Sequence, residues 1–407
     1  MIKKAISIII LTLMLMVCTS CAGSRELNEL GIITATALDI ENEKIILTNE
    51  VVIPPATEPG NPIEDKVVYV QSTGDTIFEA YRNATLEFDR KLYTAHNMVV
   101  VFGEEFAKRG IGDYIVDFLN DSEPREALYM LVAKGDKGYN LLGINAGVAS
   151  TSGDYLIGLI ENFKYTSKTR SVTLYEYFKY FYKNKTPLLG VVQKVEKIET
   201  NKKKVKDIPS KTVLNVMGGA VFRRDKLEGY YTADEMIGFN FMTNKVKGGL
   251  IVFEVPDGKI DNKLIATKGK FTTMEIISSR TKKDIEIVDG QIHLNINVRL
   301  KGTLGEETEG LRVTELDVKN SIQKACSKRI EKYIETVMNK AQKEFQIDNL
   351  DIKNLVYIKY PEVWNEISDD WDKEIFPDII YTVKVETNMV RTGLTNIPPN
   401  LEKGREK

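Results

Sequence analysis

The chain has 407 residues, of which 43% are hydrophobic and 28% are charged, and its formal net charge is −2. This is the composition of an ordinary globular protein, long enough for two or three domains. The nearly neutral charge gives no indication of a nucleic-acid-binding protein.

The N-terminus has the pattern of an export signal. Two lysines precede an apolar run over residues 5–17, and small residues separate this run from Cys21. The run is shorter than the roughly 20 apolar residues that a membrane-spanning helix needs. We therefore expect residues 1–20 to be a signal peptide that is removed on export.

The position of Cys21 resembles the lipobox of bacterial lipoproteins, in which the thiol takes a diacylglyceryl group and cleavage then makes this cysteine the new N-terminus. We expect Cys21 to carry both S-diacylglycerol and N-palmitoyl groups, because two acyl chains hold a protein stably on a bilayer. Cys18 is a departure, since lipoboxes usually carry Leu there. The alternative is a plain secretory signal that is cut near Ser20 or Ala22.

Cys326 is the other cysteine after the signal peptide. With Cys21 lipidated, no internal disulfide can form, so the exported protein depends on packed cores. Cys326 is in helical register with Ile322 and Ile330, which predicts a small buried hydrophobic residue.

The first half of the mature chain alternates strands and helices. The pattern predicts a strand, turn and strand over residues 31–53, and a short strand follows at 67–71. Thr76 and Glu79 have the spacing of a capping box, which starts a helix that runs to Phe88. The next elements predicted are strands at 98–102 and 127–133, with a helical stretch between them, and mainly helix over 140–190. Because both of these strands are apolar on two faces, we expect parallel strands that helices cover.

A charge-rich segment over residues 194–211 separates the two halves. It predicts a linker or an exposed hairpin, and the alternative is a basic patch that contacts anionic lipid headgroups. The second half opens with a strand at 213–222 and a short helix at 233–242. Further strands are predicted at 249–254, 271–278, 284–288, 291–301 and 379–390.

The longest predicted helix covers residues 313–345. Its apolar residues recur every three or four positions and form one stripe, from Val318 to Phe345. We expect this face to dock on a sheet, and the alternative is a groove for a partner helix. The fold class that follows is α/β, in the wider sense of α+β.

The sequence offers no constellation of catalytic residues. The two histidines, His96 and His293, are expected to be structural, and no phosphate loop, nucleophile elbow or metal-spaced cluster is present. We predict no catalytic, cofactor-binding or metal-binding residues. A pair of carboxylates close in space stays open, because sequence does not show such a pair.

Four stretches resemble the Ger(x)C family, the lipoprotein C subunits of GerA-type spore germinant receptors. They are Cys21 with Arg25-Glu26-Leu27-Asn28, the run Lys91 to Glu105 continuing to Arg125-Glu126, the run Gly218 to Glu235, and Pro361-Glu362-Val363-Trp364 with Trp371 and the closing strand. Ala22-Gly23-Ser24 departs from the family's usual Trp-Asp after the cysteine, and residues 346–358 lack its usual glycines.

The resemblance implies three mixed α/β domains in series, which we place at residues 21–200, 201–300 and 301–400. It also implies a lipid-anchored subunit on the outer face of the spore inner membrane. Its partners would be the integral membrane A and B subunits, and the complex would trigger germination in response to nutrients. Trp364 and Trp371, seven residues apart, are expected to share a helix face that contacts either the core or a membrane partner.

Two other functions are weighed against this receptor subunit. A solute-binding lipoprotein would deliver a small molecule to a transporter, and we would expect it to have two lobes with crossing hinge strands. A surface hydrolase would need catalytic residues, and the sequence nominates none.

Overall fold

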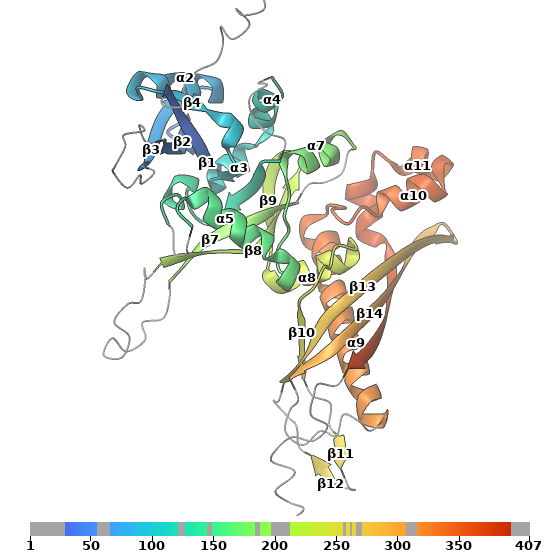
Figure 1. The fold of residues 1–407 in the computed structure, drawn as a ribbon. Coiled ribbons are helices and arrows are strands. Elements are labelled where there is room, and N and C mark those ends of the chain that lie inside the picture. The colour runs from blue at the N-terminus through green and yellow to red at the C-terminus, as the bar shows by residue number, and fades with distance from the viewer. Residues whose placement is uncertain are drawn as a thin grey trace, which may run out of the picture.

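The computed structural model describes residues 29–54, 66–120, 127–144, 149–183, 188–196, 212–254, 258–260, 263–265, 271–306 and 316–391. The predicted signal peptide, Cys21 and the charged residues 197–211 lie outside these ranges. The described residues form two large sheets with helices packed against them, and a small ribbon of β11 (Gly258–Ile260) and β12 (Lys263–Ile265) (Figure 1). In this part of the chain, no helix is long and apolar enough to cross a membrane.

The first sheet has a parallel centre and antiparallel edges. Its strand order is β3-β2-β1-β5-β6-β7-β8-β9, and β4 pairs with the start of β1. Strands β1, β5, β6 and β7 run parallel to one another in the centre, whereas the pairs β3-β2, β2-β1, β7-β8 and β8-β9 are antiparallel. The strands are β1 (Leu30–Glu41), β2 (Lys44–Ile53), β3 (Lys66–Gly74), β4 (Lys91–Tyr93), β5 (Val99–Phe102), β6 (Tyr129–Ala133), β7 (Leu188–Glu196), β8 (Thr212–Arg223) and β9 (Lys226–Tyr231).

Helices cover both faces of this sheet, as the two-sided apolar strands predict. In β5, Val100 and Phe102 belong to one core and Val99 and Val101 to another. Successive side chains of a strand point to opposite faces, so one apolar run supplies both cores. The helices are α2 (Ile77–Glu87), α3 (Glu104–Arg109), α4 (Gly112–Asn120) and α7 (Leu174–Tyr182) on one face, and α5 (Ser152–Glu161) on the other, followed by α6 (Phe163–Thr166).

The second sheet is built on one long hairpin. Its strands are β10 (Leu250–Glu254), β13 (Phe271–Val288), β14 (Gln291–Glu306) and β15 (Ile380–Arg391), in that order. Asp289 and Gly290 close the hairpin with positive φ values of 50° and 78°. A two-residue turn with both residues in this conformation matches the right-handed twist of the strands it joins. Strand β15 returns parallel to β14.

Helix α9 (Leu316–Asn339) packs on one face of this sheet and also covers its β15 edge. The predicted apolar stripe is buried, with Ile322, Cys326 and Ile330 fully enclosed. Side chains of α9 also accept hydrogen bonds from the edge of β15, where Gln323 Oε1 lies 2.8 Å from the Met389 amide nitrogen. Such contacts satisfy an edge that would otherwise be open to pairing with another chain.

The chain after α9 forms short helical segments that complete the core. The π-helical turn η5 (Lys340–Phe345) continues α9, and the following segments are α10 (Lys353–Lys359), α11 (Pro361–Ile367), η6 (Trp371–Ile375) and η7 (Phe376–Asp378). The expected helix over 313–345 is thus α9 together with η5, in the part that the structure describes. The apolar face docks on a sheet, as predicted.

The expected domain limits do not coincide with the limits of the sheets. The cut after residue 200 falls between β7 and β8, which pair in one sheet, and the cut after residue 300 falls inside β14. Hydrophobic periodicity is local and does not report which strands pair across a loop. The division into three domains stays a prediction.

Candidate functional site at the junction of the two sheets

Helix α8 (Ala233–Met242) connects the two sheets and is almost entirely buried. All residues from Met236 to Met242 are buried, as expected of a helix that is apolar around its circumference. Asn240 is the polar residue among them, and its Nδ2 donates to the carbonyl oxygens of Ser167 and Thr169, both at 3.0 Å. These bonds fix the loop after α6 against the second half of the chain.

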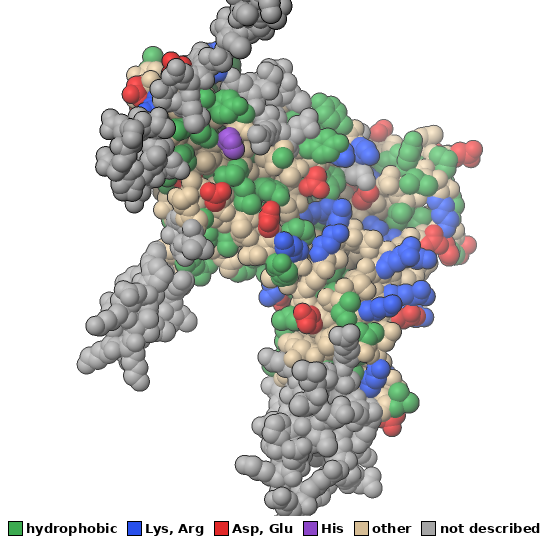
Figure 2. Space-filling view, viewed as in Figure 1, with side chains coloured by type: hydrophobic (Ala, Val, Ile, Leu, Met, Phe, Trp, Pro, Cys, Tyr) green, Lys and Arg blue, Asp and Glu red, His purple; other side chains and the backbone are tan. Residues whose placement is uncertain are grey.

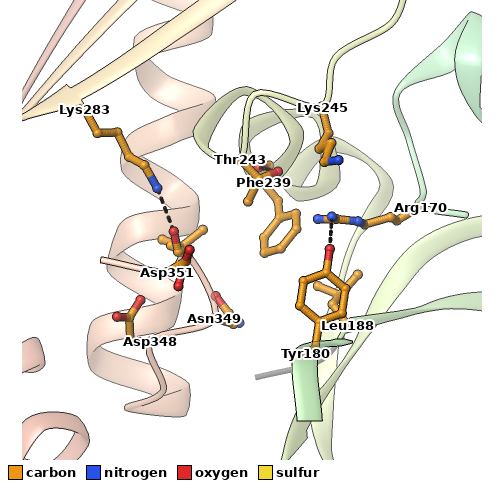
Figure 3. Close-up of a pocket in the computed structure, with 11 residues that line it drawn as sticks. Arg170, Tyr180, Leu188, Phe239, Thr243, Lys245, Lys283, Asp348, Asn349 and Asp351 are labelled. Carbon is orange, nitrogen blue, oxygen red and sulfur yellow. Dashed lines mark hydrogen bonds between the residues drawn. The ribbon is translucent and has the colours of Figure 1, made fainter. Parts of the chain in front are cut away.

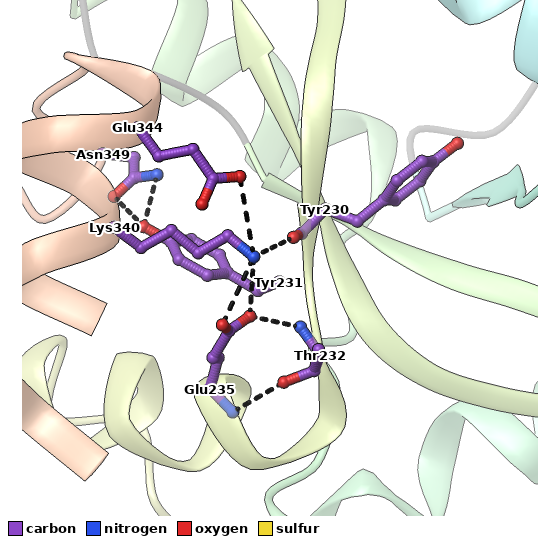
Figure 4. A network of polar contacts seen from close by, with 7 residues as sticks. All are labelled: Tyr230, Tyr231, Thr232, Glu235, Lys340, Glu344 and Asn349. Carbon is purple, nitrogen blue, oxygen red and sulfur yellow. Dashed lines mark hydrogen bonds and ion pairs between the residues drawn. The ribbon is translucent and has the colours of Figure 1, made fainter. Parts of the chain in front are cut away.

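Lys340 is the centre of a polar network that joins the two halves (Figure 4). Its Nζ lies 2.9 Å from the carbonyl oxygen of Tyr230 at the end of β9 and 3.0 Å from Glu235 Oε2 at the start of α8. The side chains of Lys340 and Glu235 are each only 16% exposed. Water screens the attraction between these two charges less than it screens a surface pair, and breaking the pair would leave a largely buried charge without a partner.

The first turn of α8 positions Glu235 for this contact. The Thr232 side chain accepts from the Glu235 amide at 3.3 Å, and Glu235 Oε2 accepts from the Thr232 amide at 2.7 Å. This is a complete capping box, a motif that the spacing Thr-x-x-Glu reveals in sequence. The contact with Lys340 is not visible there, because the two residues are 105 positions apart.

Aromatic packing reinforces the same junction. Tyr231 is fully buried, and its ring meets the rings of Phe239 and Phe345 at centroid distances of 5.7 Å and 5.3 Å. Its hydroxyl pairs with the Asn349 side chain at 3.1 to 3.2 Å, and burial raises the pKa of Tyr231. Arg223 adds a bond of 2.7 Å from Nη2 to the carbonyl oxygen of Phe345. The two sheets are therefore joined by a packed and hydrogen-bonded interface.

A cavity of about 190 Å³ opens beside this interface (Figure 3). One wall carries Arg170, whose Nη2 donates to the Tyr180 hydroxyl at 2.6 Å. The other wall carries Lys283, whose Nζ donates to the carbonyl oxygen of Leu350 at 2.7 Å. Its full lining is Arg170, Tyr180, Leu188, Phe239, Thr243, Lys245, Lys283, Asp348, Asn349, Leu350 and Asp351. The cavity combines charges of both signs and has room for a small polar molecule.

The carboxylate of Asp348, on the cavity wall, holds the surrounding loop by hydrogen bonds. Its two carboxylate oxygens accept from the backbone amides of Ile352 at 3.0 Å and Lys353 at 2.6 Å, and Oδ2 also accepts from Trp371 Nε1 at 3.2 Å. Burial raises the pKa of the Asp348 carboxyl. These bonds give Asp348 a structural role.

Trp371 lies in the core beside this loop, and the partly buried Trp364 packs against it. Trp371 is 2% exposed, and its ring contacts that of Trp364 at a centroid distance of 5.3 Å. They do not share one helix, because α11 ends at Ile367 and η6 starts at Trp371. Of the two interpretations, core packing is confirmed for Trp371.

The other residues singled out in the sequence lie apart from the junction. His96 is exposed in η3 (Thr94–His96), and His293 is half-buried on β14. Asn97, next to His96, is buried and donates from Nδ2 to Thr36 Oγ1 at 2.8 Å. Cys326 is free and buried, as predicted, and Cys21 lies outside the described residues.

Two buried carboxylates lie within the first sheet, and sequence reasoning did not single them out. Asp39, near the end of β1, accepts from the amides of Gly138 at 2.7 Å and Tyr139 at 3.0 Å. Burial raises its pKa from 3.8 to about 6, although both hydrogen bonds act in the opposite direction. Glu50 on β2 accepts from the amides of Ser152 and Gly153 at the start of α5. Both carboxylates hold distant backbone segments on the sheet.

Comparison with protein families identifies the chain. The family described as "Spore germination protein N-terminal domain" matches residues 23–194, and "Spore germination B3/ GerAC like, C-terminal" matches residues 217–393. The two matches follow each other in order and together cover most of the sequence. The chain belongs to the GerAC family of spore germination proteins. The resemblance found in the sequence is thereby confirmed.

Relatives of this GerAC family protein match over nearly their whole length. Spore germination protein KC of Bacillus subtilis (strain 168) is 27% identical, and the match covers 98% of each chain. Spore germination protein B3 of the same strain is 23% identical, with 96% of this chain and 99% of the relative covered. Spore germination protein GerQC of Bacillus cereus is 20% identical over 97% and 99% of the two chains.

A solved structure has the same fold. The crystal structure of the GerBC protein superposes with a TM-score of 0.53 at 20% sequence identity, and the match covers 87% of this chain and 96% of the GerBC chain. The mixed α/β fold class predicted from sequence is confirmed.

Proposed function

We propose that this GerAC family protein is a membrane-anchored lipoprotein subunit of a spore nutrient germinant receptor. The observation that carries the proposal is the family match in both halves of the chain. The lipobox-like position of Cys21 supports the anchor, because a diacylglyceryl and a palmitoyl group together hold a protein stably at a bilayer. The location that follows is the outer face of the spore inner membrane.

In this proposal the protein acts by contact and not by catalysis. Its partners are the integral membrane A and B subunits, and a tether at Cys21 confines the protein to the plane where it meets them. The packed junction around Lys340 suits this role, since it holds the two sheets together.

Affinity purification tests the partners. Tagged protein is extracted from spore membranes with detergent, and the co-purifying proteins are identified by mass spectrometry. We expect two multi-span membrane proteins from wild-type spores. The Cys21→Ala variant serves as control and should leave the membrane fraction and recover neither. Recovery of the wild-type protein without any multi-span partner would contradict the proposal.

The cavity beside the junction supports a second candidate, a solute-binding lipoprotein. Its volume of about 190 Å³ and its charged walls suit a small polar molecule. The connectivity argues against this class: every described strand of the first sheet precedes residue 232 and every described strand of the second follows residue 249, without crossing hinge strands. Calorimetric titration with amino acids and sugars distinguishes the two candidates, because saturable binding would favour the solute-binding lipoprotein.

A further inference from the structure

The outer face of the second sheet, opposite α9, carries a compact group of cations. We define this basic patch as Arg280 and Lys282 on β13, Arg299 and Lys301 on β14, and Lys384 on β15. All five side chains are exposed, and they alternate with core residues such as Val298 and Leu300. Figure 2 shows lysine and arginine side chains gathered over β13 and β14.

Strand register places these charges side by side. Arg280 lies directly opposite Arg299, and Ser278 lies opposite Lys301 on the same pair of strands. Like charges in directly opposed positions destabilise a sheet, so folding alone does not favour two facing arginines. Within residues 278–282, 297–301 and 384–388, the carboxylate on the outer face is Glu386, which lies 3.3 Å from Arg299 Nε and 3.8 Å from Lys384 Nζ. Asp284 and Glu286 lie farther along the same face of β13. The patch therefore has a clear excess of positive charge.

The high exposure of these side chains indicates the kind of surface that they bind. Arg299 is 78% exposed and Lys384 is 72% exposed, so both remain largely hydrated. Three of the five cations are lysines, which are depleted in protein–protein interfaces because such interfaces favour packed and desolvated groups. Hydrated cations spread over an open face instead suit a diffuse anionic surface, and the headgroups of acidic lipids attract each such cation without a fixed geometry.

We propose that the basic patch docks this face of the sheet on the anionic headgroups of a phospholipid bilayer. The proposal rests on the proposed membrane tether and deepens it, because a second, electrostatic contact would set the orientation of the molecule on the membrane. The sheet face turns toward the lipid, and α9, on the opposite face, turns away from it.

Vesicle binding of the full chain tests the patch. Sedimentation is measured with vesicles of phosphatidylcholine alone and with equal parts phosphatidylcholine and phosphatidylglycerol. We expect tighter binding to the anionic vesicles, and we expect this difference to vanish in about 1 M salt, where the Debye length is about 3 Å. Equal binding to both vesicle types would overturn the proposal.

A matched pair of variants localises the effect. The Arg280→Gln/Arg299→Gln variant should bind anionic vesicles roughly 30-fold more weakly, which corresponds to about 1 kcal/mol for each cation. Lys328→Gln/Lys332→Gln removes the same charge from α9 and should bind like wild type. Equal losses in the two variants would contradict the patch. The arginine variant should unfold at or above the wild-type temperature, because it removes a repulsive pair, and this readout shows that it is folded.

Failure of the patch is distinguishable from failure of the tether. Binding to neutral vesicles and the mass of the N-terminal peptide report on the lipid at Cys21. The difference between anionic and neutral vesicles reports on the patch alone. If the arginine variant binds vesicles like wild type yet blocks germination in spores, the face contacts a protein and the lipid proposal is overturned.

Discussion

Asp39 shows how one buried carboxyl makes stability depend on pH. Its side chain is 2% exposed, and burial raises its pKa to about 6. Between about pH 4 and pH 6 the folded state therefore binds more protons at this site than the unfolded state does. The stabilising contribution of protonated Asp39 is complete below pH 4 and is lost as the pH rises through 6.

We predict that Asp39→Asn reduces this pH dependence. Asp39 should stabilise the wild-type protein by on the order of 3 kcal/mol more at pH 4 than at pH 7, because burial raises its pKa from 3.8 to about 6. Thermal unfolding across this range measures it. Asp75→Asn is the control, because Asp75 is 69% exposed in its pair with Lys44. An unchanged slope in the Asp39 variant would contradict the assignment.

At the residue scale, sequence predicts burial better than it predicts partners. Cys326 is predicted correctly because helical register alone reports its environment. Asp39 is not singled out, because its partner Gly138 lies 99 positions away and a carboxylate at a strand end looks like an ordinary surface residue. Long-range hydrogen bonds leave no local pattern.

At the element scale, the packing of α8 on α9 depends on one glycine. A Cβ placed on Gly238 would lie 2.2 Å from the carbonyl oxygen of Tyr333 on α9. The two helices could not keep their present separation with any larger residue. Because both are buried against the same core, they have little room to move apart.

We predict that Gly238→Ala destabilises the protein by about 1–3 kcal/mol, the usual cost of overpacking a core. The matched control is Gly158→Ala in α5, where the new Cβ meets nothing within 4 Å. The control should be neutral or stabilising by up to about 1 kcal/mol, since alanine favours a helix. Denaturant unfolding measures both. A Gly238→Ala variant as stable as the control would contradict this account of the contact.

Elements with strong periodicity are predicted from sequence, and their pairing is not. The two-sided apolar strands and the α9 stripe are local patterns, and both predictions are confirmed. β8 and β9 belong to the first sheet because β8 pairs with β7 and β9 pairs with β8. The sequence between β7 and β8, residues 197–211, is charged and has no apolar periodicity that would predict this pairing. The junction cavity likewise combines residues from Arg170 to Asp351 that no sequence spacing brings together.

At the scale of the whole molecule, Lys340 links the two sheets. Its Nζ contacts the end of β9 and the start of α8, although Lys340 itself belongs to η5. Without the ammonium, Glu235 would lose its partner in a largely buried position, and the Tyr230 carbonyl would lose a donor. Leaving such groups unpaired costs more than the ion pair contributes by itself.

We predict that Lys340→Met lowers the free energy of unfolding by about 1–3 kcal/mol and separates the unfolding of the two sheets. This range lies below the 3–5 kcal/mol of a fully buried pair, because the side chains remain 16% exposed. Hydrogen exchange should speed up at η5 and β9. Lys44→Met is the control, because Lys44 and Asp75 are 53% and 69% exposed and water screens their ion pair. Equal effects of both variants would contradict the role of Lys340.

The central claim, a membrane-anchored subunit that serves nutrient-triggered germination, is tested most directly in spores that lack the gene. The account predicts normal sporulation, loss of the response to nutrients, and restoration by the wild-type gene but not by one encoding Cys21→Ala. The measurement is the loss of optical density of a purified spore suspension after nutrient addition. A normal nutrient response in the deletion strain would contradict the account.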